Sequence, residues 1–352
     1  MITNDNVLVE VENLQVAYKR ENKPDVQAVQ GVSFTIKEGE TVGIVGESGC
    51  GKSTLAKALI RGLPSNGEIT NGHIYFDGKD LASMSMKEVK SHRWWDISMI
   101  AQGAMASLDP VYTIGTQINE AIQTHEDGVS KTEGFERARE LLTFVGIDPE
   151  TVDNYPHQLS GGMRQRAIIA MSLALNPRLI IADEPTTALD VIVQKQILSN
   201  IREMQDENNS SMLMVTHDIS VVAETCDKVI VMYGGKIMEI GTVEEIFNDA
   251  YHPYTLGLQN AFPSIDGDVE ELVSIPGTPP DLANPVEGCP FKDRCPYSDP
   301  VCNEPLPARE LSENHLVHCH EPVPFEEVRR TASERGMWHE KEDPSHTEVK
   351  NE

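Results

Sequence analysis

Short apolar runs alternate with longer amphipathic segments along most of the chain. Residues 7–18 and 27–37 alternate apolar and polar positions, which predicts two antiparallel strands. Residues 41–45 form an apolar run that leads into a glycine-rich turn, and residues 52–63 have helical periodicity. The chain therefore begins with an antiparallel sheet and continues into a strand, a turn and a helix.

The middle of the chain is helical, and strands return in the second half. Residues 115–175 lack strand alternation and predict an inserted helical subdomain. This alternation predicts an α/β core with an antiparallel edge. The further predicted elements are strands at 73–76, 97–100, 179–182, 212–215, 228–232 and 236–240, and a helix at 191–204.

The composition changes after about residue 250, where proline and cysteine become frequent and apolar spacing becomes irregular. Residues 323–352 are charged and poor in apolar side chains, so we expect an acidic, disordered tail. The first residues, 1–6, have neither a basic start nor an apolar run, and the apolar segment 167–175 is too short to cross a bilayer. We therefore expect a cytosolic protein without a leader.

The charge of the chain limits its partners. Its 352 residues include 56 Asp and Glu against 29 Lys and Arg, a formal net charge of −27. Binding to nucleic acid depends largely on Lys and Arg that neutralise phosphates. We therefore expect no nucleic-acid partner.

A phosphate-binding loop occupies residues 46–53, which match GxxxxGK[ST] between a predicted strand and a predicted helix. The glycines let backbone N–H groups converge on phosphate oxygens at a helix N-terminus. Lys52 is expected to reach the β- and γ-phosphates, and the Ser53 hydroxyl to ligate Mg²⁺. The candidate nucleotide-binding residues here are Gly46, Glu47, Ser48, Gly49, Cys50, Gly51, Lys52, Ser53 and Thr54.

Two adjacent carboxylates, Asp183 and Glu184, follow the buried strand predicted at 179–182. Asp183 is expected to hold Mg²⁺, directly or through water. Glu184 is the candidate general base that polarises the water attacking the γ-phosphate. The alternative is an ordinary solvated acidic pair at a strand end.

One stretch, residues 159–166, reads LSGGMRQR. Placed between the phosphate loop and the Asp-Glu pair, it resembles the signature of ATP-binding-cassette (ABC) ATPases. In that family the signature of one subunit closes over the ATP held by another, which implies a dimer with Ser160, Gly161 and Gly162 at the partner's nucleotide. The resemblance implies a P-loop NTPase fold of the ABC cassette type over residues 7–250. That fold has a RecA-like core, an antiparallel β-subdomain and a helical subdomain at about 103–176.

The same resemblance gives roles to four scattered residues. Gln102 resembles the Q-loop glutamine that contacts Mg²⁺ or water, and His217 resembles the switch histidine that contacts the γ-phosphate. Tyr18 resembles the aromatic residue that stacks on adenine, and Asp190 lies in a match to the D-loop that crosses to the partner subunit. The alternatives are an ordinary strand aromatic for Tyr18 and a structural or surface histidine for His217.

Residues 251–322 look like the C-terminal extension of dipeptide and oligopeptide permease ATPase subunits, on the motifs HPYT, IPGTPP and GCPFKDRCP. In some members, four cysteines spaced as here bind a [4Fe–4S] cluster, for which four thiolates are the usual complement. The alternatives are Zn²⁺, with His318 and His320 beside the last cysteine, and no metal. The four are Cys289, Cys295, Cys302 and Cys319.

The resemblance thus implies the ATP-hydrolysing subunit of an importer of di- and oligopeptides, on the cytoplasmic side of the membrane. Its expected partners are two transmembrane permease subunits, a second ABC ATPase subunit that is identical or a paralogue, and an extracellular substrate-binding protein. Residues 101–110 depart from the peptide-permease pattern in the loop that faces the membrane subunits. An oligosaccharide importer therefore stays open, as does, more remotely, a soluble ABC ATPase outside transport.

Overall fold

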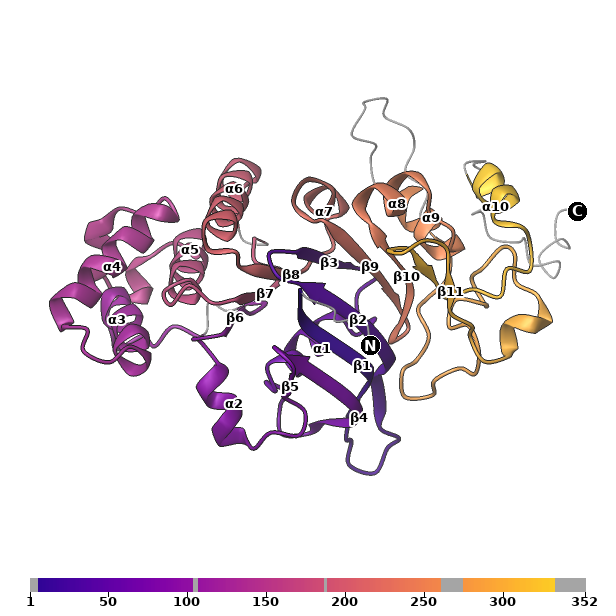
Figure 1. Ribbon diagram of the computed structural model, residues 1–352, viewed down its shortest axis with the longest axis horizontal. Coiled ribbons are helices and arrows are strands. Elements are labelled where there is room, and N and C mark those ends of the chain that lie inside the picture. The colour runs from indigo at the N-terminus through magenta and orange to yellow at the C-terminus, as the bar shows by residue number, and fades with distance from the viewer. Residues whose placement is uncertain (1–5, 104–106, 187–188, 261–274, 333–352) are drawn as a thin grey trace, which may run out of the picture.

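The computed structural model describes residues 6–103, 107–186, 189–260 and 275–332. A central sheet separates a group of helices on one side from an irregular extension on the other (Figure 1). Two predicted features lie partly outside the described residues. These are residues 104–106 of the loop expected to face the membrane subunits, and Ala188 of the expected D-loop.

A four-stranded antiparallel sheet has the order β2-β1-β4-β5. It pairs β1 with both β2 and β4, and β1 and β2 are the antiparallel strands that the alternation of residues 7–18 and 27–37 predicts. Val9, Val11 and Val16 of β1 are buried, because they point to the side of the sheet that covers the core. Its strands are β1 (Val7–Tyr18), β2 (Val26–Lys37), β4 (Gly67–Phe76) and β5 (Lys79–Asp80).

A second sheet of eight strands has the order β11-β12-β10-β9-β3-β8-β7-β6. Strands β9, β3, β8, β7 and β6 run parallel, so their carboxyl ends meet at one edge. In an open parallel sheet this edge is where ligands bind. The strands are β3 (Thr41–Val45), β6 (Ile97–Ile100), β7 (Leu179–Asp183), β8 (Ser211–Val215), β9 (Lys228–Tyr233), β10 (Lys236–Thr242), β11 (Arg309–Glu310) and β12 (Leu316–Val317).

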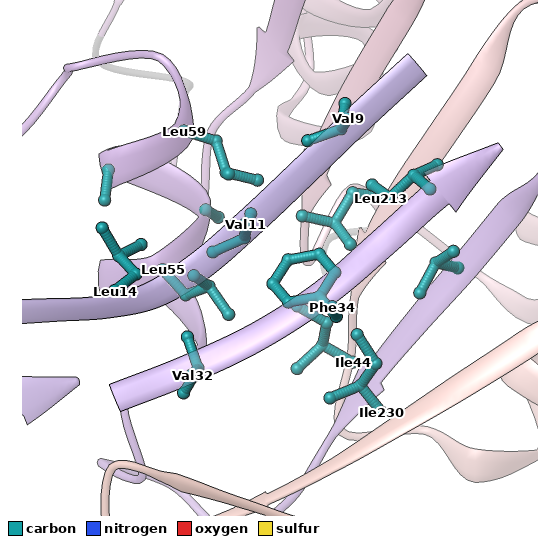
Figure 2. Close-up of a cluster of buried hydrophobic side chains, with 14 of the residues drawn as sticks. Val9, Val11, Leu14, Val32, Phe34, Ile44, Leu55, Leu59, Leu213 and Ile230 are labelled. Carbon is teal, nitrogen blue, oxygen red and sulfur yellow. The ribbon is translucent and has the colours of Figure 1, made fainter. Parts of the chain in front are cut away.

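The two sheets enclose one apolar core together with helix α1 (Lys52–Leu59). Phe34 of the antiparallel sheet faces Ile44 and Leu213 of the parallel sheet, and Leu55 of α1 fills the space beside them (Figure 2). This packing fixes the start of α1, and with it the phosphate loop, against the edge of the parallel sheet.

A second core belongs to the helices that the absence of strand alternation predicted. Ile118, Ile122, Leu142 and Ile169 are fully buried or nearly so within it. The helices there are α3 (Ile114–His125), α4 (Lys131–Phe144), the short helices η2 (Pro149–Asp153) and η3 (Pro156–Gln158), α5 (Gly161–Ser172) and α6 (Val191–Asn208).

Several short helices escaped prediction, because four to eight residues carry too few turns to show a period. The predicted helix over 52–63 ends at Leu59, where Ile60 and the left-handed Arg61 break it. The unpredicted helices are α2 (Met86–His92), α7 (Ile219–Thr225), α8 (Val243–Asn248), α9 (Pro253–Asn260) and η4 (Pro300–Asn303). Among the described residues, no helix combines the length and apolar character that a membrane crossing requires.

The C-terminal extension is joined to the central sheet. Its strand β12 pairs antiparallel with β10, so the extension adds two short strands to the sheet edge. The expectation of a disordered tail is wrong for helix α10 (Phe325–Ala332). Phe325, Val328 and Ala332 lie on one helical face and are buried, and the Tyr297 hydroxyl donates to the Val328 carbonyl. Residues 333–352 lie outside the described part of the chain.

Candidate functional site

The phosphate loop follows β3 and ends at the first turn of α1. The Lys52 ammonium folds back over it and donates to the carbonyls of Gly46 at 2.6 Å and Glu47 at 2.9 Å. It also contacts the Cys50 sulfur at 3.6 Å. The loop is therefore closed around the lysine that the sequence assigns to the β- and γ-phosphates.

Two glycines of this loop lie where no other residue fits. Gly46 has φ +146° and a Cβ there would come within 2.1 Å of the Met232 carbonyl oxygen. Gly51 has φ +105° and would bring a Cβ within 2.2 Å of the Ala28 carbonyl oxygen. The GxxxxGK spacing thus reflects close backbone packing as well as phosphate binding.

Asp183, at the end of β7, is fully buried beside the loop. Its Oδ1 accepts a hydrogen bond from the Ser53 hydroxyl at 2.9 Å. Its Oδ2 has no hydrogen-bond partner within the described part of the chain. Burial raises the pKa of the Asp183 carboxyl above its ordinary value, whereas the Ser53 hydrogen bond and Lys57 lower it. A buried oxygen without a partner, next to a serine hydroxyl, fits a hard cation such as Mg²⁺.

Glu184 sits next to Asp183 in the left-handed region, with φ 51°. This conformation is uncommon for a non-glycine residue and tends to occur at functional sites. The Glu184 carboxylate accepts from Gln102 Nε2 at 2.8 Å and contacts His217 Nδ1 at 3.3 Å. Three residues that the sequence assigns to hydrolysis thus lie together, at the ends of β6, β7 and β8.

Tyr18 lies beside the first turn of α1. Its hydroxyl is 3.0 Å from the Thr54 hydroxyl. Its ring lies against Gly67, where an added Cβ would come within 2.8 Å of the Tyr18 Cε1. The ring is half-buried. The aromatic residue therefore adjoins the first turn of α1, directly after the phosphate loop.

The signature residues and Asp190 lie apart from this group. Ser160 caps α5, which packs against α3, α4 and β6, whereas the phosphate loop leads into α1. Gly161 and Gly162 form the first turn of α5 and are half-buried. Asp190 is exposed and caps α6. The structure therefore brings the phosphate loop, Gln102, the Asp-Glu pair and His217 together, and leaves the signature facing outward.

Comparisons with known proteins agree with this arrangement. Residues 29–187 match the model of the ABC transporter family, and residues 238–302 match the C-terminal region of oligopeptide/dipeptide transporters. The oligopeptide transport ATP-binding protein OppD of Salmonella typhimurium is 45% identical over 321 residues, which is 90% of this chain and 95% of the relative. This chain belongs to the ABC transporter family. The dipeptide transport ATP-binding protein DppD of Bacillus subtilis is 46% identical over 316 residues, 89% of this chain and 94% of the relative.

Solved ABC cassettes share the fold. A dimeric structure of the ATP-binding cassette MJ0796, in a post-hydrolysis state with ADP and Pi, is 30% identical with a TM-score of 0.62. The match covers 67% of this chain and 98% of that one. The predicted α/β cassette with its antiparallel and helical parts is thereby confirmed.

The four cysteines of the extension are unpaired, and three of them are buried. Burial raises the pKa of Cys289 to about 12 and that of Cys319 to about 11. Burial also raises the pKa of Cys295, and the nearby thiols of Cys289, Cys319 and Cys302 add to this rise. Within the described ranges, no group of three or more His, Cys, Asp or Glu side chains is arranged to hold a metal ion.

Sequence reasoning missed three contacts of this ABC cassette. Gln165 of α5 donates to the Pro185 carbonyl at 2.7 Å and ties the signature helix to the segment after Glu184. Tyr254 and Arg294 both reach Glu47 of the phosphate loop. Tyr254 and Arg294 stand in motifs that the sequence singled out, but no spacing rule pairs residues more than two hundred positions apart.

Proposed function

We propose that this ABC protein hydrolyses ATP to drive the uptake of di- and oligopeptides through separate membrane subunits. The main support for ATP hydrolysis is the position of Glu184, which contacts Gln102 and His217 and lies next to Asp183 and the phosphate loop. Matches to oligopeptide and dipeptide transport proteins over nearly the whole chain support the peptide substrate.

In the proposed reaction the phosphate loop binds the nucleotide through its backbone N–H groups, and Lys52 turns from the Gly46 and Glu47 carbonyls toward the β- and γ-phosphates. Ser53 and Asp183, with Gln102, would hold Mg²⁺, which neutralises charge on the phosphates. Tyr18 would stack on the adenine ring.

Glu184 then orients the attacking water and takes its proton, while Gln102 and His217 hold the Glu184 carboxylate in place. The left-handed backbone of Glu184 keeps its side chain on the side of these partners. The attack breaks the bond between the β- and γ-phosphates and leaves ADP and phosphate.

The signature supports a dimer. Ser160 is exposed at the N-terminus of α5, Gly161 and Gly162 form the first turn of this helix, and the first N–H groups of a helix have no partner within it. We propose that these groups and Asp190 contact a nucleotide held by a second ABC ATPase subunit, identical or paralogous. Two permease subunits and an extracellular binding protein complete the importer, with this chain on the cytoplasmic face.

The four extension cysteines are proposed to hold a [4Fe–4S] cluster. The backbone N–H of Glu321, two residues after Cys319, donates to the Cys319 sulfur at 3.4 Å. The backbone N–H groups of Phe291 and Tyr297 likewise act to lower the pKa of Cys289 and of Cys295, against the effect of burial. Such N–H···S hydrogen bonds stabilise thiolates that carry a metal. Each iron of a cluster takes its own thiolate, so the four sulfurs need not converge on one point as zinc ligands must. Bound to the four cysteines, the cluster would cross-link residues 289–319 and stabilise the fold of the extension.

Anaerobic purification tests the cluster. We expect a brown protein with broad absorbance at about 400 nm and about four irons per chain. Conversion of Cys289 to serine should remove colour and iron, whereas the same change at Cys226, a cysteine outside the extension, should leave both. A colourless preparation that contains zinc, or no metal at all, would refute the cluster.

Uptake measured in the source cell tests the peptide substrate. Deletion of the gene should abolish accumulation of labelled di- and oligopeptides, and the wild-type chain should restore it, but the Lys52→Ala variant should not. Loss of oligosaccharide uptake with normal peptide uptake would replace the peptide substrate by a sugar. Normal uptake of both would rule out either transport role.

A further inference from the structure

Arg294 connects the cysteine-bearing loop of the extension to the phosphate loop. It immediately precedes Cys295, and its Nη1 donates to Glu47 Oε2 at 2.7 Å and to the Tyr233 hydroxyl at 2.9 Å. Glu47 is the second residue of the phosphate loop, and its partner lies 247 positions away in the sequence. The extension therefore reaches the nucleotide site through an ion pair.

The guanidinium of Arg294 is held on all sides. Its side chain is only 7% exposed, and that of Glu47 is 23% exposed. Its Nε donates to the Pro276 carbonyl at 2.8 Å and its Nη2 to the Ile275 carbonyl at 2.9 Å. Because each of the three guanidinium nitrogens already has an acceptor, the side chain meets Glu47 in a fixed orientation.

The motif around Gly277 positions the two carbonyls, of Ile275 and Pro276, that accept hydrogen bonds from Arg294. Gly277 has φ +83°, a conformation that L side chains rarely adopt, and a Cβ there would come within 3.3 Å of the Arg294 Cγ. The turn at Gly277 follows directly on Ile275 and Pro276, whose carbonyls face the guanidinium. The two motifs IPGTPP and GCPFKDRCP thus meet at one arginine.

Glu47 is also held through its backbone. Its N–H donates to the Tyr254 hydroxyl at 2.8 Å, and Tyr254 is fully buried. The Tyr254 ring packs against Tyr233 at 4.6 Å and against Phe291, in the cysteine loop, at 5.2 Å. The Glu47 carbonyl in turn accepts from Lys52. Residues outside the loop therefore fix the residue on which the phosphate-binding lysine rests.

We propose that Arg294 is a positioning residue for the phosphate loop, so that the C-terminal extension sets the ATP affinity of the cassette. This inference rests on the proposed ATPase function. Arg294 acts through Glu47 and does not touch the nucleotide. Removal of the guanidinium leaves the Glu47 carboxylate without its partner and frees the first half of the loop to move.

Purified Arg294→Gln and Glu47→Gln variants test this proposal by titration with a fluorescent ATP analogue and by steady-state kinetics. We expect each variant to bind ATP about tenfold more weakly, the loss that one charge-assisted hydrogen bond supports. In Arg294→Gln, KM should rise while kcat at saturating ATP stays within about twofold. The double variant should be no weaker than either single one, because both remove the same contact.

Lys292→Gln is the matched control. Lys292 lies two residues before Arg294 and donates to the Glu287 carbonyl and to Asn303 Oδ1, both within the extension. Its loss should lower the melting temperature of the extension without changing ATP affinity. Iron and zinc analysis of every variant separates loss of a metal from loss of the contact with Glu47. If Arg294→Gln fails to fold, Glu47→Gln still tests the contact, because Glu47 lies outside the extension.

Two results distinguish failure of the positioning role of Arg294 from failure of the proposed ATPase function. ATP binding by the Arg294→Gln and Glu47→Gln variants that equals the wild type, in a protein where Lys52→Ala abolishes binding, would overturn the positioning role alone. A wild-type protein that binds no more ATP than Lys52→Ala would overturn the proposed ATPase, and this inference with it. Additive losses in the double variant would show that Arg294 and Glu47 act independently, which also contradicts the proposal.

Discussion

Gln102 donates a hydrogen bond of 2.8 Å to the carboxylate of Glu184, across 82 positions of sequence. The two residues meet because β6 and β7 run parallel and end at the same edge of the sheet. Gln102 lies after the end of β6 and before the helices that begin at α3. The candidate base Glu184 is therefore in direct contact with the segment that connects β6 to these helices.

Asp183→Asn tests the magnesium site. The change keeps the shape of the side chain and the Ser53 contact but removes the charge that balances a divalent cation. We expect hydrolysis to fall by about 100-fold or more, with Mg²⁺-dependent tightening of ATP binding lost. Isothermal titration with and without Mg²⁺ measures this directly, and equal Mg²⁺ dependence in the variant and the wild type would exclude Asp183 as a ligand.

Ser160→Ala tests the signature with a control from the same chain. Ser160 and Ser130 each cap a helix, accepting the N–H of Met163 and of Glu133, both at 3.2 Å. Both alanine variants should lose about 1 kcal/mol of unfolding free energy. Only Ser160→Ala should also lose ATP-dependent association with the second ABC subunit, as followed by light scattering. Equal association by the two variants would contradict the role of the signature.

Glu245 should make stability depend on pH. Burial opposes its ionisation, but the Thr242 N–H, the Ser312 hydroxyl and the Thr242 hydroxyl outweigh burial and lower its pKa below the ordinary value. A carboxyl with a lowered pKa in the folded state stabilises that state above its unfolded pKa of about 4.3, and the contribution disappears as the pH falls through the folded value. Glu245→Gln should therefore cost about 1 kcal/mol at pH 7 and less below pH 4.

Glu244→Gln is the control for this effect, because Glu244 lies in the same first turn of α8 and is exposed. Chemical denaturation at several pH values measures both variants. A loss that is the same at pH 7 and at about pH 3, or equal in the two variants, would show that the Thr242 and Ser312 contacts do not act through the charge of Glu245.

Much of this architecture follows from the sequence. Strand alternation in residues 7–18 predicts β1, and the apolar runs before residues 46 and 183 place the phosphate loop and the Asp-Glu pair at strand ends. Parallel strands then bring those ends together, so the grouping of Lys52, Asp183 and Glu184 needs no long-range information.

Other features depend on packing that no period encodes. Arg294 meets Glu47 across 247 positions of sequence, and the extension that carries Arg294 also pairs β12 with β10 at the edge of the sheet. The tail looked disordered because charged residues dominate it, yet Phe325, Val328 and Ala332 suffice to bury one face of a short helix. The cysteine spacing identifies four sulfur donors but leaves their arrangement open.

Glu184 is the proposed base for ATP hydrolysis. Turnover of ATP by the Glu184→Gln variant tests it most directly, alongside ATP binding and association with the second ABC subunit. We predict that turnover falls by about 100-fold or more, the usual share of a general base, while ATP binding is retained and the ATP-bound dimer persists. Turnover equal to that of the wild type would show that Glu184 is not the base.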